Sequence, residues 1–208
     1  MPVTLRIGLL LSGNGSVLQT LLSAIGDGSL DAKVEAVVTN RDCPALGVAT
    51  RAGIPMLRLF DIADFASKAG RDAAMGAFLV SAGVELAIVG GYSEHLDEAF
   101  FQEFGDNIIG MYPALLPAFA ELPEAVGPAL EYGVKVIGVT VHYRTANSGS
   151  AGAIIAQEPI PVTDDDTIQS VEKRIIELER WLLPQVLAQM SLGQIVRDGH
   201  RVKRSPHE

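Results

Sequence analysis

Short apolar segments alternate with helical patterns along the first half of this chain, and this alternation constrains the fold more than any other feature. Residues 4–11 form a nearly continuous run of strand-forming residues that stops at Ser12-Gly13. Apolar residues then recur at helical spacing until Gly26–Gly28, where that helix is expected to end. Repeated strand–turn–helix units of this kind require a parallel sheet whose two faces are covered by helices.

The alternation continues to residue 111. The next elements are predicted as strands over 34–38, 56–59, 85–89 and 107–111, and as helices over 45–52, 71–81 and 97–104. Beyond Pro117 the pattern changes, since two longer strands, 135–143 and 153–162, are joined by the polar segment 144–152. This arrangement indicates an antiparallel addition to the edge of the sheet.

A long helix is predicted near the C-terminus. Asp166 is the expected N-cap, paired with Gln169 three residues later, and an apolar stripe runs through Val171, Ile175, Leu178 and Leu182. We therefore predict one α/β domain over residues 1–195, with a mostly parallel twisted sheet, helices on both faces, and a ligand cleft at the carboxyl ends of its strands. The basic residues from Arg197 to Arg204 are expected to belong to a solvated tail, residues 196–208.

Bulk composition limits the kinds of partner. A chain of 208 residues with 48% hydrophobic content can bury a substantial core, and its net charge of -9 argues against binding to nucleic acid, which needs a basic surface. Because Cys43 is the only cysteine, no intramolecular disulfide can form, and Cys43-Pro44 is typical of a helix start. No apolar run is long enough to span a bilayer and no secretory leader is recognisable, so a cytoplasmic protein without membrane contact is expected.

The turn after the first predicted strand is rich in glycine. Gly13-Asn14-Gly15-Ser16 leads from that strand into a helix, whose first N–H groups lack partners and can be approached closely by an anion. Phosphate is the natural ligand, although a tight strand-to-helix turn without a ligand explains the same residues. The segment is a poor dinucleotide fingerprint, because Leu18 occupies the place of the third small residue.

Several segments together resemble the glycinamide ribonucleotide formyltransferases. Ser12 to Gln19 matches the family's phosphate loop, usually Ser-Gly-Asn-Gly-Ser-Asn-Leu-Gln. Ala52 to Pro55 matches Ala-Gly-Ile-Pro, and Gly110 to Pro117 falls on the active-site segment Asn-Ile-His-Pro-Ser-Leu-Leu-Pro. Further matches in the expected order are Val141-His142-Tyr143, Gly152 to Gln157 and Asp166-Thr167. The resemblance covers residues 6–192 and implies a Rossmann-like formyltransferase fold.

This resemblance also implies an activity and its sites. The family transfers a one-carbon formyl group from 10-formyltetrahydrofolate to the amine of a phosphorylated substrate in purine biosynthesis. No spacing of His, Cys, Asp and Glu residues in the sequence indicates a metal site. The residues matched to substrate phosphate binding are Gly13, Asn14, Gly15, Ser16 and Val17. Glu179 matches the acidic residue that binds the ribose, with a solvated glutamate as the alternative. The residues matched to the folate side are Arg71, Tyr92, Ser93, Glu94, His95 and Leu96. The sequence does not decide whether the protein is a monomer or a homodimer.

The positions that carry the family's chemistry are changed. Its catalytic Asn, His and Asp are matched here by Gly110, Tyr112 and Ser150, with Asn147 as the nearest other polar candidate for the third. Formyl transfer needs donors for an oxyanion and a group that moves protons, so a divergent member with altered or lost transfer is predicted. Tyr112, His142 and Ser150 are the candidates for an altered catalytic site, unless His142 is a structural histidine.

Two other substitutions concern the ligands. Val17 replaces an asparagine of the phosphate loop, and Glu94 replaces a folate-side arginine, which argues against binding of the anionic folate. The alternative function is a non-catalytic paralogue that binds a phosphorylated metabolite or a protein partner. An enzyme should bring Tyr112 together with His142, Ser150 or Glu94 on an open cleft. A binding protein needs only the open loop from Gly13 to Ser16.

Overall fold

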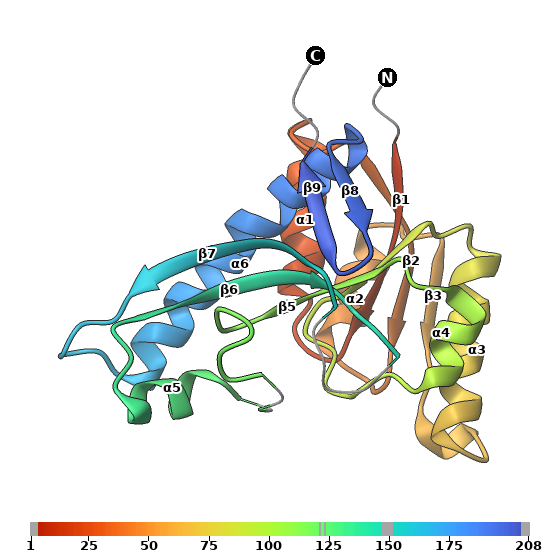
Figure 1. Ribbon diagram of the computed structural model, residues 1–208. Coiled ribbons are helices and arrows are strands. Elements are labelled where there is room, and N and C mark those ends of the chain that lie inside the picture. The colour runs from red at the N-terminus through yellow and green to blue at the C-terminus, as the bar shows by residue number, and fades with distance from the viewer. Residues whose placement is uncertain (1–3, 121, 123, 147–151, 205–208) are drawn as a thin grey trace.

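A seven-stranded sheet forms the centre of the molecule (Figure 1). The computed structural model describes residues 4–120, 122, 124–146 and 152–204. The strands of this sheet are β1 (Leu5–Leu11), β2 (Ala32–Thr39), β3 (Met56–Leu59), β4 (Leu86–Val89), β5 (Ile108–Tyr112), β6 (Val136–Tyr143) and β7 (Ile154–Pro161). Their order is β3-β2-β1-β4-β5-β6-β7. The first five pair in parallel, while β5–β6 and β6–β7 are antiparallel, as the sequence predicts.

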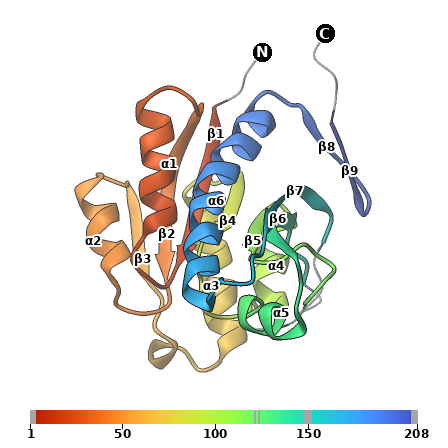
Figure 2. The ribbon, with the colours of Figure 1, turned by 90° about the vertical axis from the view of Figure 1, so that its left-hand side faces the viewer.

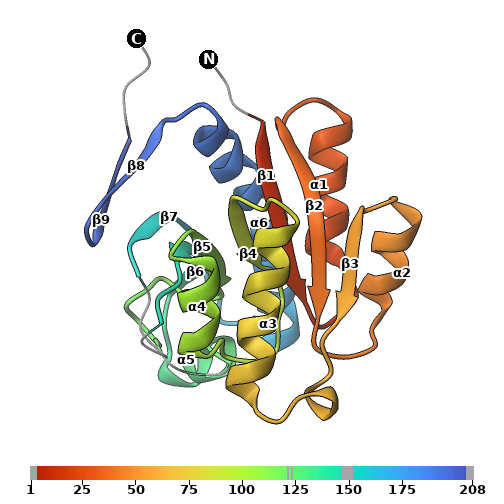
Figure 3. The same ribbon diagram turned by 90° about the vertical axis from the view of Figure 1, so that its right-hand side faces the viewer.

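Helices cover both faces of the sheet (Figures 2 and 3). The helices are α1 (Ser16–Gly26), α2 (Pro44–Arg51), α3 (Lys68–Ser81), α4 (Glu98–Phe104), α5 (Val126–Tyr132) and α6 (Ile168–Ser191), with the short 3-10 helix η1 (Ile62–Asp64). On one face α1, α2 and α6 pack against inward-facing residues such as Ile7, Leu9 and Ile109. On the other face α3 and α4 pack against Leu10, Ala87 and Ile108. The alternation of neighbouring strand residues between two cores explains why these strands are apolar throughout.

The strand order reverses direction at β1. The chain moves from β1 to β2 and β3 on one side, and then returns to place β4 and β5 on the other side of β1. The loops that follow β1 and β4 therefore diverge at the carboxyl edge of the sheet, where open α/β folds form their ligand crevice. This topology positions Gly13 and Gly90 beside one another.

The last helix begins one residue later than predicted. Thr167 is the N-cap, and it forms a reciprocal capping box with Ser170 rather than Gln169. Asp166 instead accepts hydrogen bonds from the Thr163 N–H at 2.8 Å and from the Ser170 hydroxyl at 2.8 Å. These bonds, the Thr163 N–H first among them, lower the pKa of Asp166 to about 2. The Asp166 carboxylate is thus held by the Thr163 N–H and the Ser170 hydroxyl, and Thr167 takes the N-cap position.

The C-terminal segment is more ordered than the predicted solvated tail. Strands β8 (Ile195–Asp198) and β9 (Arg201–Arg204) pair as an antiparallel hairpin across Gly199-His200. Gly199 has a φ of 60°, which a two-residue hairpin turn requires. The Arg197 guanidinium lies 4.8 Å from the ring centre of Tyr143 and holds the hairpin beside β6. Within the described residues, none of the helices has both the length and the apolar character needed to cross a bilayer.

Candidate ligand-binding site

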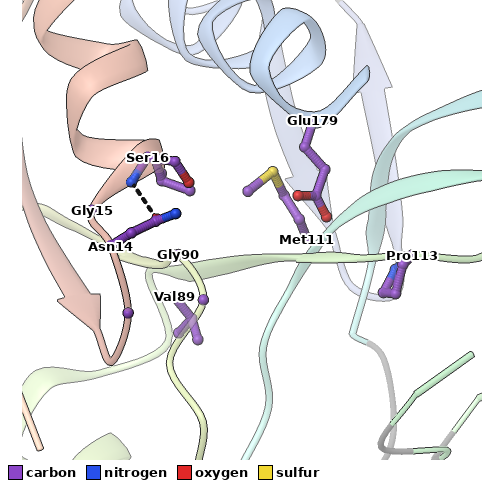
Figure 4. A pocket seen from close by; sticks show the side chains of 11 residues that line it. Asn14, Gly15, Ser16, Val89, Gly90, Met111, Pro113 and Glu179 are labelled. Carbon is purple, nitrogen blue, oxygen red and sulfur yellow. Dashed lines mark hydrogen bonds between the residues drawn. The ribbon is translucent and has the colours of Figure 1, made fainter. Parts of the chain in front are cut away.

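The loop between β1 and α1 forms one wall of an open pocket (Figure 4). Gly15 is the N-cap of α1 with a φ of 76°, a conformation that glycine adopts without strain. A Cβ at Gly15 would also lie 3.1 Å from Cα of Ala45, closer than ordinary van der Waals contact, so a side chain here would push against the start of α2. The Asn14 side chain accepts a hydrogen bond from the Ser16 N–H at 3.0 Å and fixes the turn. No acidic residue occupies the first turn of α1.

The opposite wall of the pocket comes from β4, β5 and α6. Figure 4 shows Glu179 reaching from α6 toward Met111 and Pro113, across from Asn14, Gly15 and Ser16. The pocket has a volume of about 290 Å³. Its described lining is Gly13, Asn14, Gly15, Ser16, Val17, Val89, Gly90, Gly91, Met111, Pro113 and Glu179. The structure therefore brings the predicted phosphate loop and the predicted ribose residue into one site, although their roles stay predictions.

Glu179 is the titratable group of this pocket. Its side chain is half-buried on α6, and desolvation raises its pKa to about 7, against a smaller opposing effect of Arg180. A poorly hydrated carboxylate is stabilised by a hydrogen bond from a hydroxyl or N–H group of a ligand. Glu179 is thus suited to accept a hydrogen bond from a polar ligand in the pocket.

Tyr112 does not line this pocket. Its hydroxyl oxygen lies 2.6 Å from the carbonyl oxygen of Phe119 and 2.7 Å from that of Leu122, so its single proton is shared between two backbone acceptors. Burial raises the pKa of Tyr112, so the phenol stays protonated near neutral pH and is not available as a base. In this position Tyr112 fastens the segment after β5 rather than presenting its hydroxyl to the pocket.

His142 lies on β6, directly opposite Gly110 in the neighbouring strand β5. The histidine is 4% exposed, and its Nδ1 lies 2.9 Å from the carbonyl oxygen of Tyr143. Desolvation lowers the pKa of His142 to about 4, and the nearby positive charge of Arg144 contributes to the shift. The ring is therefore neutral at pH 7, while its buried Nε2 has no hydrogen-bond partner among the residues that the structure describes. His142 and Tyr112 form no hydrogen bond with each other.

The predicted folate-side residues form an internal polar network. Arg71 is fully buried, and its guanidinium binds both carboxylate oxygens of Glu94, at 2.7 and 3.2 Å. Arg71 also donates to Asp72 at 2.9 Å. Burial alone would lower the pKa of Arg71, but the two carboxylates outweigh it and raise that pKa, while the Arg71 hydrogen bond lowers the pKa of Glu94. The arginine that matches the family's folate-side cation is thus already paired.

The rest of this segment is anchored to the strand ends. Asn40, after β2, accepts a hydrogen bond from Ser12 at 2.6 Å and donates to Glu94 at 2.5 Å. The Ser12 hydroxyl in turn accepts from the Ser93 N–H at 2.9 Å. Of the other predicted folate-side residues, Tyr92 and Leu96 are buried in the core under α3 and α4, and His95 is exposed.

Several features of this region were not predicted from the sequence. Thr140 and Gln157 bind the backbone of Ala114 and Leu116, and so hold the segment after β5 in place. Arg144 packs over Gly110, the position that lacks the family's asparagine. Ser150 and Asn147 lie outside the described residues. Among the residues that are described, no three His, Cys, Asp or Glu side chains gather in an arrangement that could hold a metal ion.

Comparisons with known proteins agree with this architecture. The family model described as "Formyl transferase" matches residues 5–187. The phosphoribosylglycinamide formyltransferase of Mycobacterium tuberculosis is 37% identical over 187 residues, which cover 89% of this chain and 85% of that protein. The enzyme of the same name from Haemophilus influenzae is 34% identical over 191 residues, covering 91% and 89%. The crystal structure of glycinamide ribonucleotide transformylase 1 from Symbiobacterium toebii superposes with a TM-score of 0.90 at 37% identity, over 97% of this chain and 94% of that one. This chain belongs to the formyl transferase family.

Proposed function

We propose that this protein binds the phosphoribosyl part of a glycinamide ribonucleotide-like ligand in the pocket between α1 and α6, and that it transfers formyl groups slowly or not at all. The observation that carries the proposal is the contrast between two parts of the site. The loop of residues 13–17 and Glu179 share an open pocket of about 290 Å³. The positions that serve chemistry in the family hold Gly110 and a tyrosine whose hydroxyl is occupied by backbone.

The proposed position of the phosphate group is the start of α1. The first N–H groups of a helix lack intrahelical acceptors, and the positive end of the helix dipole stabilises an anion there by about 0.3–1 kcal/mol, and more in partly buried sites. Gly15 lets the anion approach the backbone closely, and no carboxylate of the first turn competes for it. The Val17 side chain adds no hydrogen bond, so the backbone and Ser16 supply the recognition.

The expected loss of formyl transfer follows from missing donors. Loss of one oxyanion donor typically costs about a hundred- to a thousand-fold in rate, and loss of a general acid or base about a hundred- to ten-thousand-fold, with incomplete additivity. Gly110 offers no side chain at the first position. At the second, the hydroxyl of Tyr112 is bound to the backbone and its pKa is raised.

Folate binding is proposed to be weak for a related reason. Membership of the family implies a folate-derived formyl donor, whose glutamate is anionic. Here Glu94 stands where the family has an arginine, and Arg71 is buried and paired with Glu94 and Asp72. The cation that would face the donor is therefore neutralised within the protein.

The positions of the polar side chains favour a non-catalytic binding protein over an enzyme with an altered active site. A new catalytic site would need Tyr112, His142 or Glu94 to meet around a substrate. Instead, the Tyr112 hydroxyl is bound to the carbonyls of Phe119 and Leu122, and Glu94 is bound by Arg71. Neither group has a hydrogen bond to His142.

Calorimetric titration with glycinamide ribonucleotide tests the proposal. We expect saturable binding, weakened at least about tenfold by Gly15→Ala, because the added Cβ would strain a φ of 76° and approach Ala45. Glu179→Gln should also weaken binding at pH 8, while Glu177→Gln, an exposed neighbour on the same helix, should not. Absence of binding, or equal effects of Glu179→Gln and Glu177→Gln, would contradict the proposed pocket. Rapid formyl transfer by the same protein would contradict the proposed loss of chemistry.

A further inference from the structure

Arg144 lies on the face of the sheet that is covered by α3 and α4, away from the proposed nucleotide pocket. It follows β6 directly, and its N–H donates to the carbonyl of Ile108 at 2.8 Å. Gly110 pairs with His142 in the same ladder, and cross-strand partners project to the same face. Ile108 packs into the core beneath α3 and α4, so Arg144, His142 and the bare backbone of Gly110 share this face.

The Arg144 side chain extends over the glycine. A Cβ at Gly110 would lie 3.1 Å from Cδ of Arg144 and 3.8 Å from its Nη1. The first of these distances is tighter than ordinary van der Waals contact, so the arginine occupies the place where a side chain at position 110 would begin. The Arg144 side chain therefore covers the bare backbone of Gly110 on this face of the sheet.

The guanidinium of Arg144 has no counter-ion among the residues that the structure describes. It makes no hydrogen bond or ion pair there, although it is half-buried and burial lowers its pKa. His142, whose pKa the charge of Arg144 helps to lower, is neutral at pH 7. On the same side of the sheet, Glu94 and Asp72 are bound by Arg71, and the residues 147–151 that follow Arg144 include no Asp or Glu.

A desolvated charge without a partner is costly, and proteins ordinarily pair such a group or use it to bind a ligand. We propose that Arg144 forms a subsite for a small carboxylate group beside the bare backbone of Gly110. The planar guanidinium matches a carboxylate through two parallel N–H···O hydrogen bonds. This subsite is independent of the proposed nucleotide pocket, because the loop of residues 13–17 is on the α1 and α6 side of β5.

Binding of formate, the smallest carboxylate, tests the proposal by saturation-transfer NMR at constant ionic strength in chloride. Saturating phosphate is added to occupy the loop at α1. We expect a saturable formate signal in the wild type that is weakened at least about tenfold by Arg144→Gln, the typical effect of losing a charge-assisted hydrogen bond. The formate affinity of Arg144→Lys should be intermediate, because lysine keeps the positive charge but cannot form the two parallel hydrogen bonds of a guanidinium. Arg58→Gln, at an exposed arginine stacked on Phe60, is the matched control and should bind as the wild type does.

A second variant addresses the same site without removing the arginine. Gly110→Ala places a methyl group 3.1 Å from Arg144 Cδ and should displace the guanidinium, with weaker formate binding in a protein whose melting temperature is checked. Equal affinity in the wild type, Arg144→Gln and Gly110→Ala would overturn the proposal.

Discussion

Replacing Glu94 by glutamine should destabilise the protein through Arg71. The Arg71 side chain is 1% exposed and keeps a contact of 2.8 Å with Asp72, whereas the Glu94 side chain is 34% exposed. Removal of one partner from a fully buried ion pair costs about 3–5 kcal/mol. Because Glu94 is partly solvated and Asp72 remains, we expect a loss of about 1–3 kcal/mol in the free energy of unfolding, or about 2–12 °C in melting temperature for a chain of this size.

The effect should depend on pH in a defined direction. Hydrogen bonding from Arg71 lowers the pKa of Glu94 below its ordinary value of 4.5. A carboxylate whose pKa is lowered by folding contributes stability that is complete above the unfolded-state pKa and is lost as the pH falls through the folded-state pKa. The difference in the free energy of unfolding between wild type and Glu94→Gln should therefore have its full value at pH 7 and decrease below about pH 4.5.

Urea denaturation of both proteins at pH 7 and pH 3 measures this difference. Glu131→Gln, at an exposed residue of α5, serves as the matched control and should change stability by less than about 0.5 kcal/mol. Equal stability of Glu94→Gln and Glu131→Gln at pH 7, or a Glu94→Gln deficit that is unchanged at pH 3, would refute the reasoning from the Arg71 pair.

Three further predictions concern the residues around β5. Tyr112→Phe should lose about 1 kcal/mol in urea denaturation, because the hydroxyl that binds the Phe119 and Leu122 carbonyls is removed; no change would contradict this role. Between pH 6.5 and pH 4 the unfolded chain binds a proton at residue 142 that the folded protein does not. The free energy of unfolding of the wild type should therefore decrease by up to about 3 kcal/mol as the pH is lowered through this range, and a His142→Gln protein with the same slope would contradict this role of His142. The pH dependence from Glu179 has the opposite sign, because its raised pKa means that the folded state binds the extra proton. The free energy of unfolding of the wild type relative to Glu179→Gln should therefore decline by about 1–3 kcal/mol from pH 4.5 to pH 8, and parallel pH profiles of the two proteins would disprove this.

The sequence was sufficient to predict most of the sheet. Continuous apolar runs ending at Gly13 and Gly90 predicted parallel strands, and the longer runs beyond Pro117 predicted the antiparallel edge that β6 and β7 form. Helix α5 was missed because Gly127-Pro128 lowers its intrinsic helical preference, and packing against α6 overrides it. The β8–β9 hairpin was missed although Asp198-Gly199 is a turn signal, since the basic side chains suggested a solvated tail.

The candidate site was harder to predict, for a physical reason. The Tyr112 hydroxyl is bound by backbone carbonyls, which carry no sequence signature. Glu94 suggested a more acidic ligand site, but Arg71, 23 residues earlier, neutralises it. The contact of Arg144 with Gly110 could not be predicted from the sequence, because it depends on the register between β5 and β6. Each case depends on a contact between distant segments rather than on a local pattern.

The most direct test of the account is the turnover number for formyl transfer from 10-formyltetrahydrofolate to glycinamide ribonucleotide, with both compounds at saturating concentration. An ordinary enzyme turns over at about 10 per second, and loss of one oxyanion donor alone lowers that rate about a hundred- to a thousand-fold. We predict a turnover number no higher than about 0.1 per second. A value near 10 per second would contradict the account, because Gly110 and the backbone-bound Tyr112 would then sit in a fully competent active site.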